Sequence, residues 1–341
     1  MKINVWNTIL QLSKERGVEP AVIISAIEES LHVASANYFS HNEKVVVAFR
    51  PEKGELRVYA AKKVAEKPQA SGTEISLEEA RKIKASASPG DTVEIDLPAD
   101  TLGRISAQSA KQVIFQKVRD AEQEKIYLDF APRTGEIITG TVRRFENDNI
   151  ILEVSRTEAL FPAREKLPNE VFERGATVKA LITQVQKTNK GPQIFVSRTH
   201  PRFLAKLIEL ETPEITDGQI EIRDLVRQPG ERAKVAVFSR ERDIDPVGAC
   251  IGVKGNRILS ISRELQGEKI DVIEWSANPA VYAKSALSPA RVERVLVVDK
   301  DQKTMQALVP KDQLSLAIGK KGINVKLASR LVGWKIEIKQ V

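Results

Sequence analysis

Hydrophobic positions in the first 130 residues follow helical and strand-like spacings in turn. Apolar residues three to four apart indicate helices, whereas short apolar runs and alternation indicate strands. The predicted helices cover 3–39 (with a break near Gly17 and Pro20), 77–85 and 106–126, and the predicted strands cover 45–49, 56–60 and 92–97. The first two strands flank Pro-Glu-Lys-Gly, a hairpin signal, and Ser76 with Glu79 forms a capping box. We expect 1–130 to be an α+β domain.

Residues 135–199 carry a different pattern, in which short apolar alternations follow each other closely. Five strand-like segments are separated by turn residues and cover 137–142, 149–154, 158–161, 178–185 and 193–197. Five strands at this density are typical of a small closed barrel of the OB type, which often binds oligonucleotides. A base-contacting face could be formed by Arg143, Arg144, Phe145, Asn149, Phe161 and Arg164. Alternatively, Phe161 packs in the core and the arginines are solvated.

Residues 201–341 contain an internal repeat with an offset of 67 residues. The segment from Asp245 to Ile258 matches that from Asp312 to Val325. After one gap, Gly267 to Ile270 matches Gly333 to Ile336. Each copy reads as helix, strand, strand, helix, Gly-x-x-Gly, helix and strand, with strands predicted at 220–226, 234–239, 270–275, 292–298, 304–309 and 336–339. We expect two domains of one fold, 201–276 and 277–341.

Ile-Gly-x-x-Gly between two short helices is the signature of KH domains, which bind single-stranded RNA. The glycines let the backbone approach a phosphate without interfering Cβ atoms, and the following helix N-terminus offers free N–H groups. A lone Gly-x-x-Gly is usually an ordinary helix-ending turn, but two copies with matching flanks argue against that alternative. The candidate RNA-binding residues are Ile251, Gly252, Val253, Lys254, Gly255, Asn256, Arg257, Ile318, Gly319, Lys320, Lys321, Gly322 and Asn324.

The composition argues against metal and membrane chemistry. One Cys and three scattered His exclude a disulfide framework, a Cys-built zinc or iron–sulfur site and a His-rich metal centre, so we expect no metal and no cofactor. The glycine spacing does not match a nucleotide-binding P-loop. Cys250 aligns with Ala317 in the repeat, which favours a small buried residue over a nucleophile. Because no membrane-span-length apolar run and no secretory signal are visible, we expect a cytoplasmic protein.

Charge is distributed unevenly along the chain, which has 53 Lys+Arg, 46 Asp+Glu and a net charge of +7. Residues 1–130 carry 18 basic and 19 acidic side chains, whereas 201–341 carry 24 and 19. A near-neutral front and a basic rear suggest a protein-facing part followed by a polyanion-facing part. Alternatively, +7 over 341 residues is a modest excess on a solvated surface, and charge alone does not decide between the two. Aromatic residues make up only 5% of the chain, which disfavours a long stacking channel for single strands.

The run from Asp245 to Ile258 closely resembles the bacterial NusA family of transcription termination/antitermination factors, as do Ser197 to Pro201 and the stretch 213–232. Residues 158–162 and 170–175 fit the family's S1-type barrel, although the Phe-Gly-x-Phe and His pattern of well-known RNA-binding S1 domains is missing. The resemblance implies a multidomain α+β protein. Its parts would be an RNA polymerase-binding domain (1–130), an S1-type OB barrel (135–199) and two tandem type II KH domains (201–276 and 277–341).

The resemblance also implies a function and partners. A family member would bind the RNA polymerase core and nascent single-stranded RNA, modulate pausing, intrinsic termination and antitermination, and work with other Nus factors. We expect a non-enzymatic monomer without the acidic C-terminal repeats that some relatives carry. Two alternatives remain at this stage: an RNA-processing enzyme, since KH and S1 modules occur in exoribonucleases, and a ribosome-associated KH protein. Residues 1–130 offer no catalytic constellation, which disfavours the first.

Overall fold

The computed structural model describes residues 2–4, 6–36, 45–50, 55–68, 72–96, 99–189, 191–241 and 243–341. The chain divides into two compact units. The first comprises Met1–Leu128 with Asn189–Pro192, and the second comprises Asp129–Thr188 with Gln193–Val341. Among the described residues, no helix combines the length and the apolar character that a membrane crossing requires.

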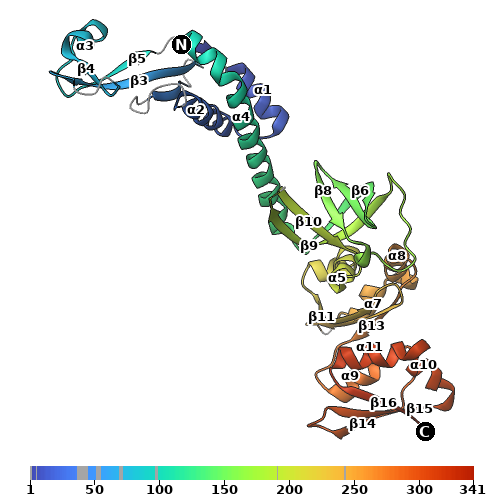
Figure 1. The fold of residues 1–341 in the computed structure, drawn as a ribbon. Helices are drawn as coiled ribbons and strands as arrows, with labels where there is room; N and C mark the ends of the chain where they lie inside the picture. The colour runs from blue at the N-terminus through green and yellow to red at the C-terminus, as the bar shows by residue number, and fades with distance from the viewer. Residues whose placement is uncertain are drawn as a thin grey trace. The chain divides into compact units, whose positions relative to one another are not determined.

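A mixed sheet organises the first unit, and its central strand β3 contacts all the others (Figure 1). The strands are β1 (Lys2–Asn4), β2 (Val45–Arg50), β3 (Glu55–Ala65), β4 (Glu74–Ser76) and β5 (Thr92–Asp96). The helices are α1 (Trp6–Arg16), α2 (Pro20–Ala36), α3 (Leu77–Ile83) and α4 (Ala99–Phe130), whose last two residues belong to the second unit. Two small cores result: Ile9, Val18, Ile23 and Val118 between helices, and Val64, Ile75, Ala80, Ala87 and Val93 under α3.

The hydrophobic pattern of the first unit predicts most of these elements, but it misses β4 and predicts α4 over 106–126 only. The hairpin is confirmed, because β2 and β3 pair antiparallel, while its connection 51–54 lies outside the described residues. The helix predicted from residue 3 is wrong at its start, where Lys2–Asn4 pairs with β3 as a strand. Gly17, at a φ of 64°, separates α1 from α2. Ser76 caps α3 by accepting the amide proton of Glu79 at 3.3 Å.

The second unit begins with a closed five-stranded barrel. Its strands are β6 (Ile137–Glu146), β7 (Asn149–Val154), β8 (Thr157–Phe161), β9 (Thr177–Thr188) and β10 (Gly191–Ser197). They follow the order β10-β8-β7-β6-β9, in which only β8 and β10 run parallel. This is the OB-type barrel that the sequence predicts. Alternating strand positions point inward, so that side chains such as Leu152, Phe161, Ile182 and Ile194 are fully buried.

The two repeats fold alike, each as a three-stranded sheet with helices on one face. The first KH repeat (201–276) contains α5 (Pro201–Glu211), α6 (Pro213–Thr216), β11 (Ile220–Gln228), β12 (Arg232–Ser239), α7 (Pro246–Ile251), α8 (Asn256–Glu264) and β13 (Lys269–Glu274). The second KH repeat (277–341) contains α9 (Pro279–Ala286), β14 (Arg294–Asp299), β15 (Thr304–Val309), α10 (Leu314–Ile318), α11 (Ile323–Val332) and β16 (Lys335–Gln340). In both sheets the first pair of strands is antiparallel and the second pair is parallel.

The helices of the second KH repeat lie between two sheets (Figure 1). A single core cluster joins Ala236 and Ile273 of the first sheet to Ala283 and Ala328 of the helices and to Met305 of the second sheet. The small alanine side chains let α9 and α11 approach the first sheet closely. Both glycine loops therefore belong to one continuous packed body.

Candidate nucleic-acid interface

The two glycine loops have the same backbone conformation. The first glycines, Gly252 and Gly319, have φ/ψ of 76°/173° and 77°/166°. The second glycines, Gly255 and Gly322, have 77°/14° and 74°/13°. The lysine between them takes a left-handed conformation in both copies, with φ of 51° at Lys254 and 53° at Lys321. The repeat seen in the sequence is thus a repeat of local geometry.

Each glycine in the first loop is required for a different reason. A Cβ at Gly252 would collide with the Asn256 side chain and lie 2.7 Å from Cγ of Arg257. A Cβ at Gly255 would meet only Leu259, at 3.9 Å, so only the positive φ favours glycine there. In the second loop, Gly319 likewise approaches Asn324 closely. The loop therefore turns tightly at its first glycine and opens at its second.

The second glycine of each loop is also the N-cap of the next helix. The N–H of Asn256 donates to the carbonyl of Val253, and the N–H of Ile323 donates to the carbonyl of Lys320. Glycine has no side chain that could accept from the N–H groups that follow in the first turn of α8 or α11, which are therefore uncapped by the loop. The positive end of the helix dipole lies at the same place. This arrangement fits a phosphate group.

The side chains between the glycines are exposed. Val253 is 80% exposed, and Lys254, Lys320 and Lys321 are exposed as well. The second loop therefore presents two ammonium groups where the first presents one. Ile251 is partly buried and Ile318 is 38% exposed. Exposed aliphatic side chains adjoin both loops, namely Leu259 on α8 and Leu316 on α10.

Asn324 and Arg257 are equivalent in the repeat, and the structure gives both a supporting position. Asn324 is fully buried, and its Nδ2 donates to the carbonyls of Ala317 (3.0 Å), Leu287 (3.0 Å) and Leu316 (3.3 Å). The side chain of Asn324 thus holds the end of α10, and its contact with RNA stays a prediction. Nη1 of Arg257 donates to the carbonyl of Ala249, the residue equivalent to Leu316, at 2.6 Å.

Arg257 is also held by a carboxylate. Its Nη1 lies 3.0 Å from Oε2 of Glu214, and the side chain is 26% exposed. This ion pair lowers the charge that Arg257 presents to a phosphate. Asn256, in contrast, is exposed at the start of α8. The structure thus brings Lys254, Asn256, Lys320 and Lys321 to the surface of the loops, and places the other polar candidates beneath them.

The barrel face is electrically balanced. Arg143 and Arg144 both pair with Glu158, and Arg144 also pairs with Glu146 at 2.6 Å. The hydrogen bond from Arg144 holds the pKa of Glu158 below its usual value. Two carboxylates therefore neutralise the two arginines at this face.

The remaining barrel candidates separate into exposed and buried side chains. Phe145 is 52% exposed, and Arg164 is 87% exposed with Glu165 3.7 Å away. Asn149 accepts from the amide of Ala163 at 3.1 Å and so fixes a turn. Phe161 is fully buried, with its ring edge-on to Phe172 at 5.8 Å. Phe161 is therefore a core residue, which agrees with the alternative that the sequence leaves open for it.

A buried ionic seam joins the barrel to the first KH repeat, and the sequence did not reveal it. Arg198, 3% exposed, lies 2.7 Å from Glu170 and 2.8 Å from Glu264. Arg227 and Glu268, both fully buried, form a bidentate pair at 2.7 and 2.8 Å. Nη1 of Arg227 also donates to the carbonyl of Arg198 at 2.8 Å, which links the two pairs. These contacts fix the barrel relative to the first loop.

Two further groups have shifted pKa values. Ser197 and Thr199 each donate to Oε2 of Glu165 at 2.6 Å. Burial raises the pKa of Glu165, but the two hydroxyl donors, together with the charges of Arg164 and His200, hold it below its usual value. Burial also raises the pKa of the Cys250 thiol to about 11. Cys250 is fully buried, which confirms the prediction of a core residue.

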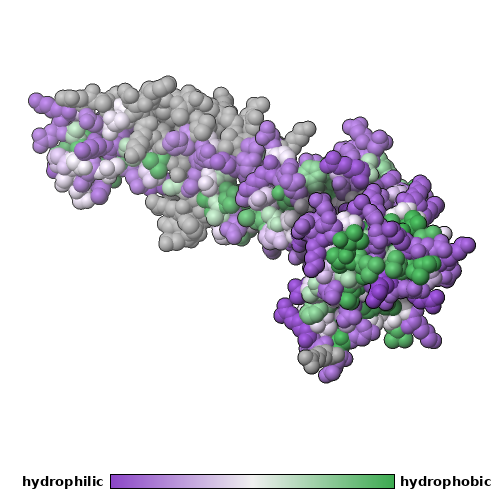
Figure 2. All heavy atoms as spheres, turned by 90° about the horizontal axis from the view of Figure 1, so that it is seen from below, coloured by the Kyte–Doolittle hydropathy of each residue, from purple (hydrophilic) through white to green (hydrophobic). Residues whose placement is uncertain are grey.

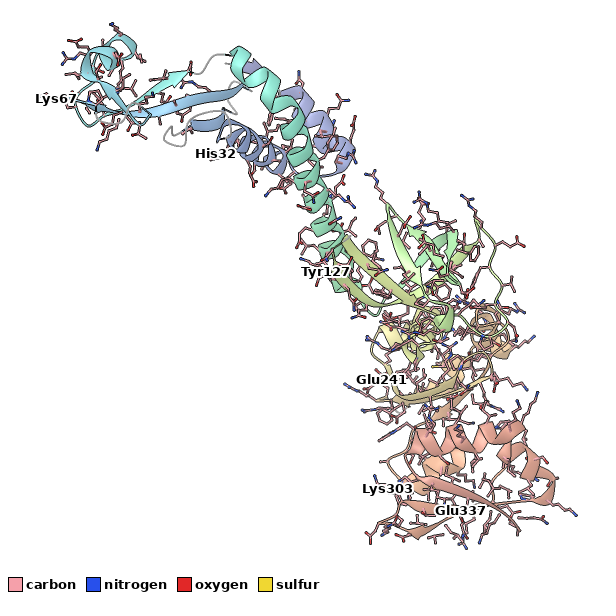
Figure 3. All side chains as sticks on the ribbon, in the orientation of Figure 1. His32, Lys67, Tyr127, Glu241, Lys303 and Glu337 are labelled. Atoms are coloured by element: carbon pink, nitrogen blue, oxygen red, sulfur yellow. The ribbon has the colours of Figure 1, made fainter. Side chains whose placement is uncertain are left out.

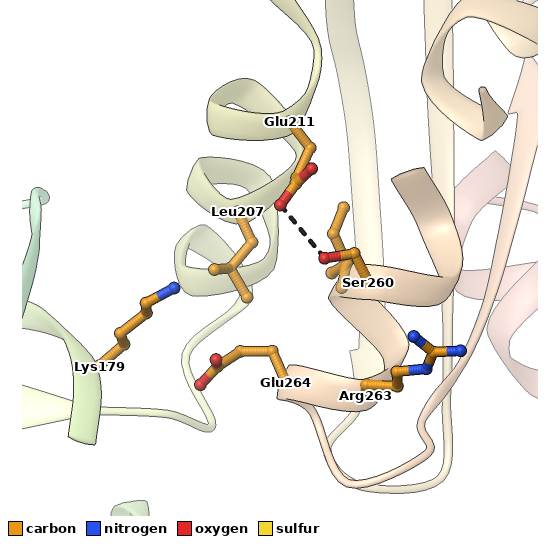
Figure 4. A pocket seen from close by; sticks show the side chains of 7 residues that line it. Lys179, Leu207, Glu211, Ser260, Arg263 and Glu264 are labelled. Atoms are coloured by element: carbon orange, nitrogen blue, oxygen red, sulfur yellow. Dashed lines mark hydrogen bonds between the residues drawn. The ribbon is translucent and has the colours of Figure 1, made fainter. Parts of the chain in front are cut away.

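A cavity of about 360 Å³ opens between β9 of the barrel and helices α5 and α8 (Figure 4). Its lining includes Lys179 and Arg263 together with Glu211 and Glu264, and Ser260 donates to Glu211 at 3.3 Å. Two cations and two carboxylates give this lining no preference for a phosphate. Among the described residues, no three His, Cys, Asp or Glu side chains are placed to share a metal ion.

Comparisons with known proteins agree with this arrangement along the chain. Three family models match: the NusA N-terminal domain at residues 4–124, the NusA-like first KH domain at 198–275 and the NusA-like second KH domain at 279–341. The transcription termination/antitermination protein NusA of Halalkalibacterium halodurans is 45% identical over 99% of this chain and 88% of its own length. The Bacillus subtilis protein of the same name is 44% identical over 99% of this chain and 91% of its own.

More distant relatives and a solved structure carry the same name. NusA of Thermus thermophilus is 37% identical, over 96% of this chain and 88% of its own length. The solution structure of the N-terminal domain of NusA from B. subtilis is 39% identical. It covers 35% of this chain and 96% of that one, with a TM-score of 0.30.

Proposed function

The chain belongs to the NusA family of transcription termination/antitermination proteins, and we propose that it binds nascent single-stranded RNA through its two glycine loops while it is held on RNA polymerase. The observation that carries the RNA part is the pair of loops with one backbone conformation, each ending on a glycine N-cap and each exposing lysine. A phosphate at each loop would meet free N–H groups, a helix dipole and one or two ammonium groups. The neighbouring aliphatic side chains suit unstacked bases.

We propose that the first unit docks on the polymerase core. The near-neutral charge of 1–130 and the match of 4–124 to the NusA N-terminal domain support this assignment. Docking would raise the local concentration of the KH loops near emerging RNA, so that weak loop contacts become effective. The factor would then lengthen pauses, favour intrinsic termination, and take part in antitermination together with other Nus factors.

The proposed RNA site comprises the loop residues from Ile251 to Asn256 and from Ile318 to Gly322. The barrel contributes less in this proposal, because Arg143 and Arg144 are neutralised by neighbouring carboxylates. The proposed domain limits remain 1–130, 135–199, 201–276 and 277–341. No catalytic group takes part, so the proposed factor is not an enzyme, and pure protein should leave labelled RNA intact with and without phosphate.

Charge reversal in the loops of the full-length chain tests the proposal. Two variants carry Val253→Asp with Lys254→Asp, or Lys320→Asp with Lys321→Asp, and a control carries Lys300→Asp with Lys303→Asp in the exposed turn between β14 and β15. We expect each loop variant to lose RNA affinity by about tenfold or more, which corresponds to about 1.4 kcal/mol. The control should lose much less, although the second loop variant and the control change the net charge equally.

The same proteins are then added to elongation complexes of RNA polymerase paused at an RNA hairpin. The loop variants should still bind polymerase but should lengthen the pause less than the wild-type chain. Unchanged RNA affinity in both loop variants would refute the RNA site. Loss of polymerase binding in the loop variants would refute the division of labour between the two units.

A further inference from the structure

The sheet of the second KH repeat has one face covered by α9 and α11 and one face without a described covering element. Strand β15 alternates strictly: Met305, Ala307 and Val309 are fully buried, whereas Gln306 and Leu308 are partly exposed on the other face. Leu296, paired with Gln306, is 40% exposed, and Val298 in the adjoining bulge is 56% exposed. Figure 2 looks onto this side of the molecule and shows apolar side chains gathered between polar ones.

The first KH repeat shows how an equivalent face is covered. There, Val226, Ala236 and Ile273 pack against the helices α9 and α11, and Ala236 is fully buried. The hydroxyl of Tyr282 on α9 donates to Asp224 at 3.2 Å. A sheet of this fold is thus able to accept a helical layer, held by small apolar contacts at its centre and a polar contact at its edge.

Strand registers identify the equivalent residues in the two sheets. Asp224, Ala236 and Ile273 form one cross-strand row in the first sheet. The matching glycines Gly267 and Gly333 align that row with Arg294, Leu308 and Lys339 in the second sheet. The next row, Val226, Lys234 and Asp271, aligns with Leu296, Gln306 and Glu337.

The face of the second sheet keeps apolar residues at its centre but differs in charge from the equivalent face of the first sheet. Leu296 and Leu308 keep the centre apolar. Arg294 stands where the first sheet has Asp224, and Lys339 stands where it has Ile273. Both cationic side chains are exposed. Glu337 lies on the same face, opposite Gln306, where it pairs with Lys335 at 3.0 Å and also interacts with Lys339 (Figure 3). Three cations of this face, Arg294, Lys335 and Lys339, outnumber this one carboxylate. The uncovered sheet face therefore combines an apolar centre with cationic ends.

We propose that this sheet face, defined by Arg294, Leu296, Gln306, Leu308 and Lys339, is a docking surface for an acidic amphipathic helix of another protein. Apolar residues of the helix contact Leu296 and Leu308, and carboxylates on its border pair with Arg294 and Lys339. The face lies across the sheet from α10 and α11, which flank the second glycine loop, so the surface is separate from the proposed RNA site.

Two other occupants fit the face less well. RNA would use aromatic side chains for stacking, and none of the five residues that define the face is aromatic. A second copy of this chain, seated face to face, would bring the same patches together. Arg294 and Lys339 would then oppose the cations of the other copy, and like charges across an interface are unfavourable.

Site-specific photocrosslinking of the full-length chain in its host cells tests this proposal. A benzophenone amino acid replaces Val298 beside the face, and in a control protein it replaces Val171, which is 87% exposed on the barrel. Crosslinked peptides are sequenced by mass spectrometry. We expect the Val298 probe to capture a segment of another protein that carries net negative charge and apolar residues at helical spacing, and we expect the Val171 probe not to capture it.

A charge-reversed pair of variants then tests the role of the cations. Arg294→Glu with Lys339→Glu should reduce the yield of that crosslink by about tenfold or more, because like charges replace ion pairs. Lys300→Glu with Lys303→Glu makes the same change of charge in the adjacent turn and should leave the yield within about twofold, since exposed charges off the contact are screened. Arg294→Gln with Lys339→Gln, a milder change, gives the same comparison if the reversed variant unfolds.

Several outcomes would overturn the proposal: a crosslink to RNA or to a second copy of the chain, a captured segment without acidic helical character, a yield no higher than at Val171, or a yield that does not respond to Arg294 and Lys339. RNA affinity measured on the same proteins keeps this result distinct from the proposed RNA site, because loss of loop binding would leave the Val298 crosslink in place.

Discussion

In the second KH repeat, removing the two loop lysines and removing the Asn324 side chain should have opposite effects on stability and on the salt dependence of RNA affinity. Lys320 and Lys321 are exposed, so the double change to alanine should alter the free energy of unfolding by no more than about 0.5 kcal/mol. If both ammonium groups neutralise phosphates, the slope of log affinity against log salt should become shallower by about 1.4, at about 0.7 per phosphate on single strands.

Asn324→Ala should lower the stability and leave the salt slope unchanged. The amide nitrogen of this buried side chain carries two protons and donates to three carbonyls at 3.0, 3.0 and 3.3 Å. At about 1 kcal/mol for each hydrogen bond, with the carbonyls left without this donor, the cost should be about 2–3 kcal/mol. Because the lysines remain, RNA affinity should fall with no change in the salt slope.

Urea unfolding and fluorescence anisotropy with a labelled single-stranded RNA, repeated over a series of salt concentrations, measure both quantities on the full-length chain. An unchanged salt slope in the double lysine variant would show that the second loop does not contact phosphate. An unchanged stability together with a loss of RNA affinity in Asn324→Ala would show that Asn324 contacts the RNA directly and does not act through the loop.

Three further predictions concern the body that carries the loops. Glu268→Gln leaves the buried guanidinium of Arg227 without its charge partner and should destabilise the second unit by about 3–5 kcal/mol in urea unfolding, so a loss below 1 kcal/mol would contradict the buried pair. Gly255→Ala should lower the free energy of unfolding by about 1–2 kcal/mol, because the φ of Gly255 is 77° and its Cβ would meet no close atom. Gly252→Ala should lower it by more, since a Cβ there also collides with neighbouring side chains. Equal losses in thermal unfolding would be inconsistent with that collision. The NMR-measured pKa of Glu165 should lie below that of an ordinary glutamate, because burial raises it but the hydroxyl donors and the charges of Arg164 and His200 together lower it by more. Its contribution to stability is present above the unfolded pKa and is lost as the pH falls through the folded pKa, and a pKa raised above the ordinary value would contradict this sign.

Features that depend on local spacing could be predicted from the amino-acid order. Two copies of Ile-Gly-x-x-Gly predict two loops of one conformation, because only glycine adopts the positive φ at those positions without cost. The alternating apolar positions of 135–199 predict the barrel strands, because side chains of a strand alternate between the core and the solvent. The positions of the loop lysines also follow from local spacing, since they lie between the two glycines of each loop.

Which polar and aromatic side chains face the solvent depends on how distant segments pack together. Arg257 and Asn324 resemble loop contacts in the sequence, yet carbonyls of the preceding helices turn them inward. Phe161 is buried because neighbouring strands close the barrel around it. The seam of Arg198 with Glu264 joins residues 66 positions apart. Burial and pairing depend on segments brought together from far along the chain, which local spacing does not encode. For the same reason, the exposed sheet face of the second repeat is defined by the register of three strands and not by the sequence of any one of them.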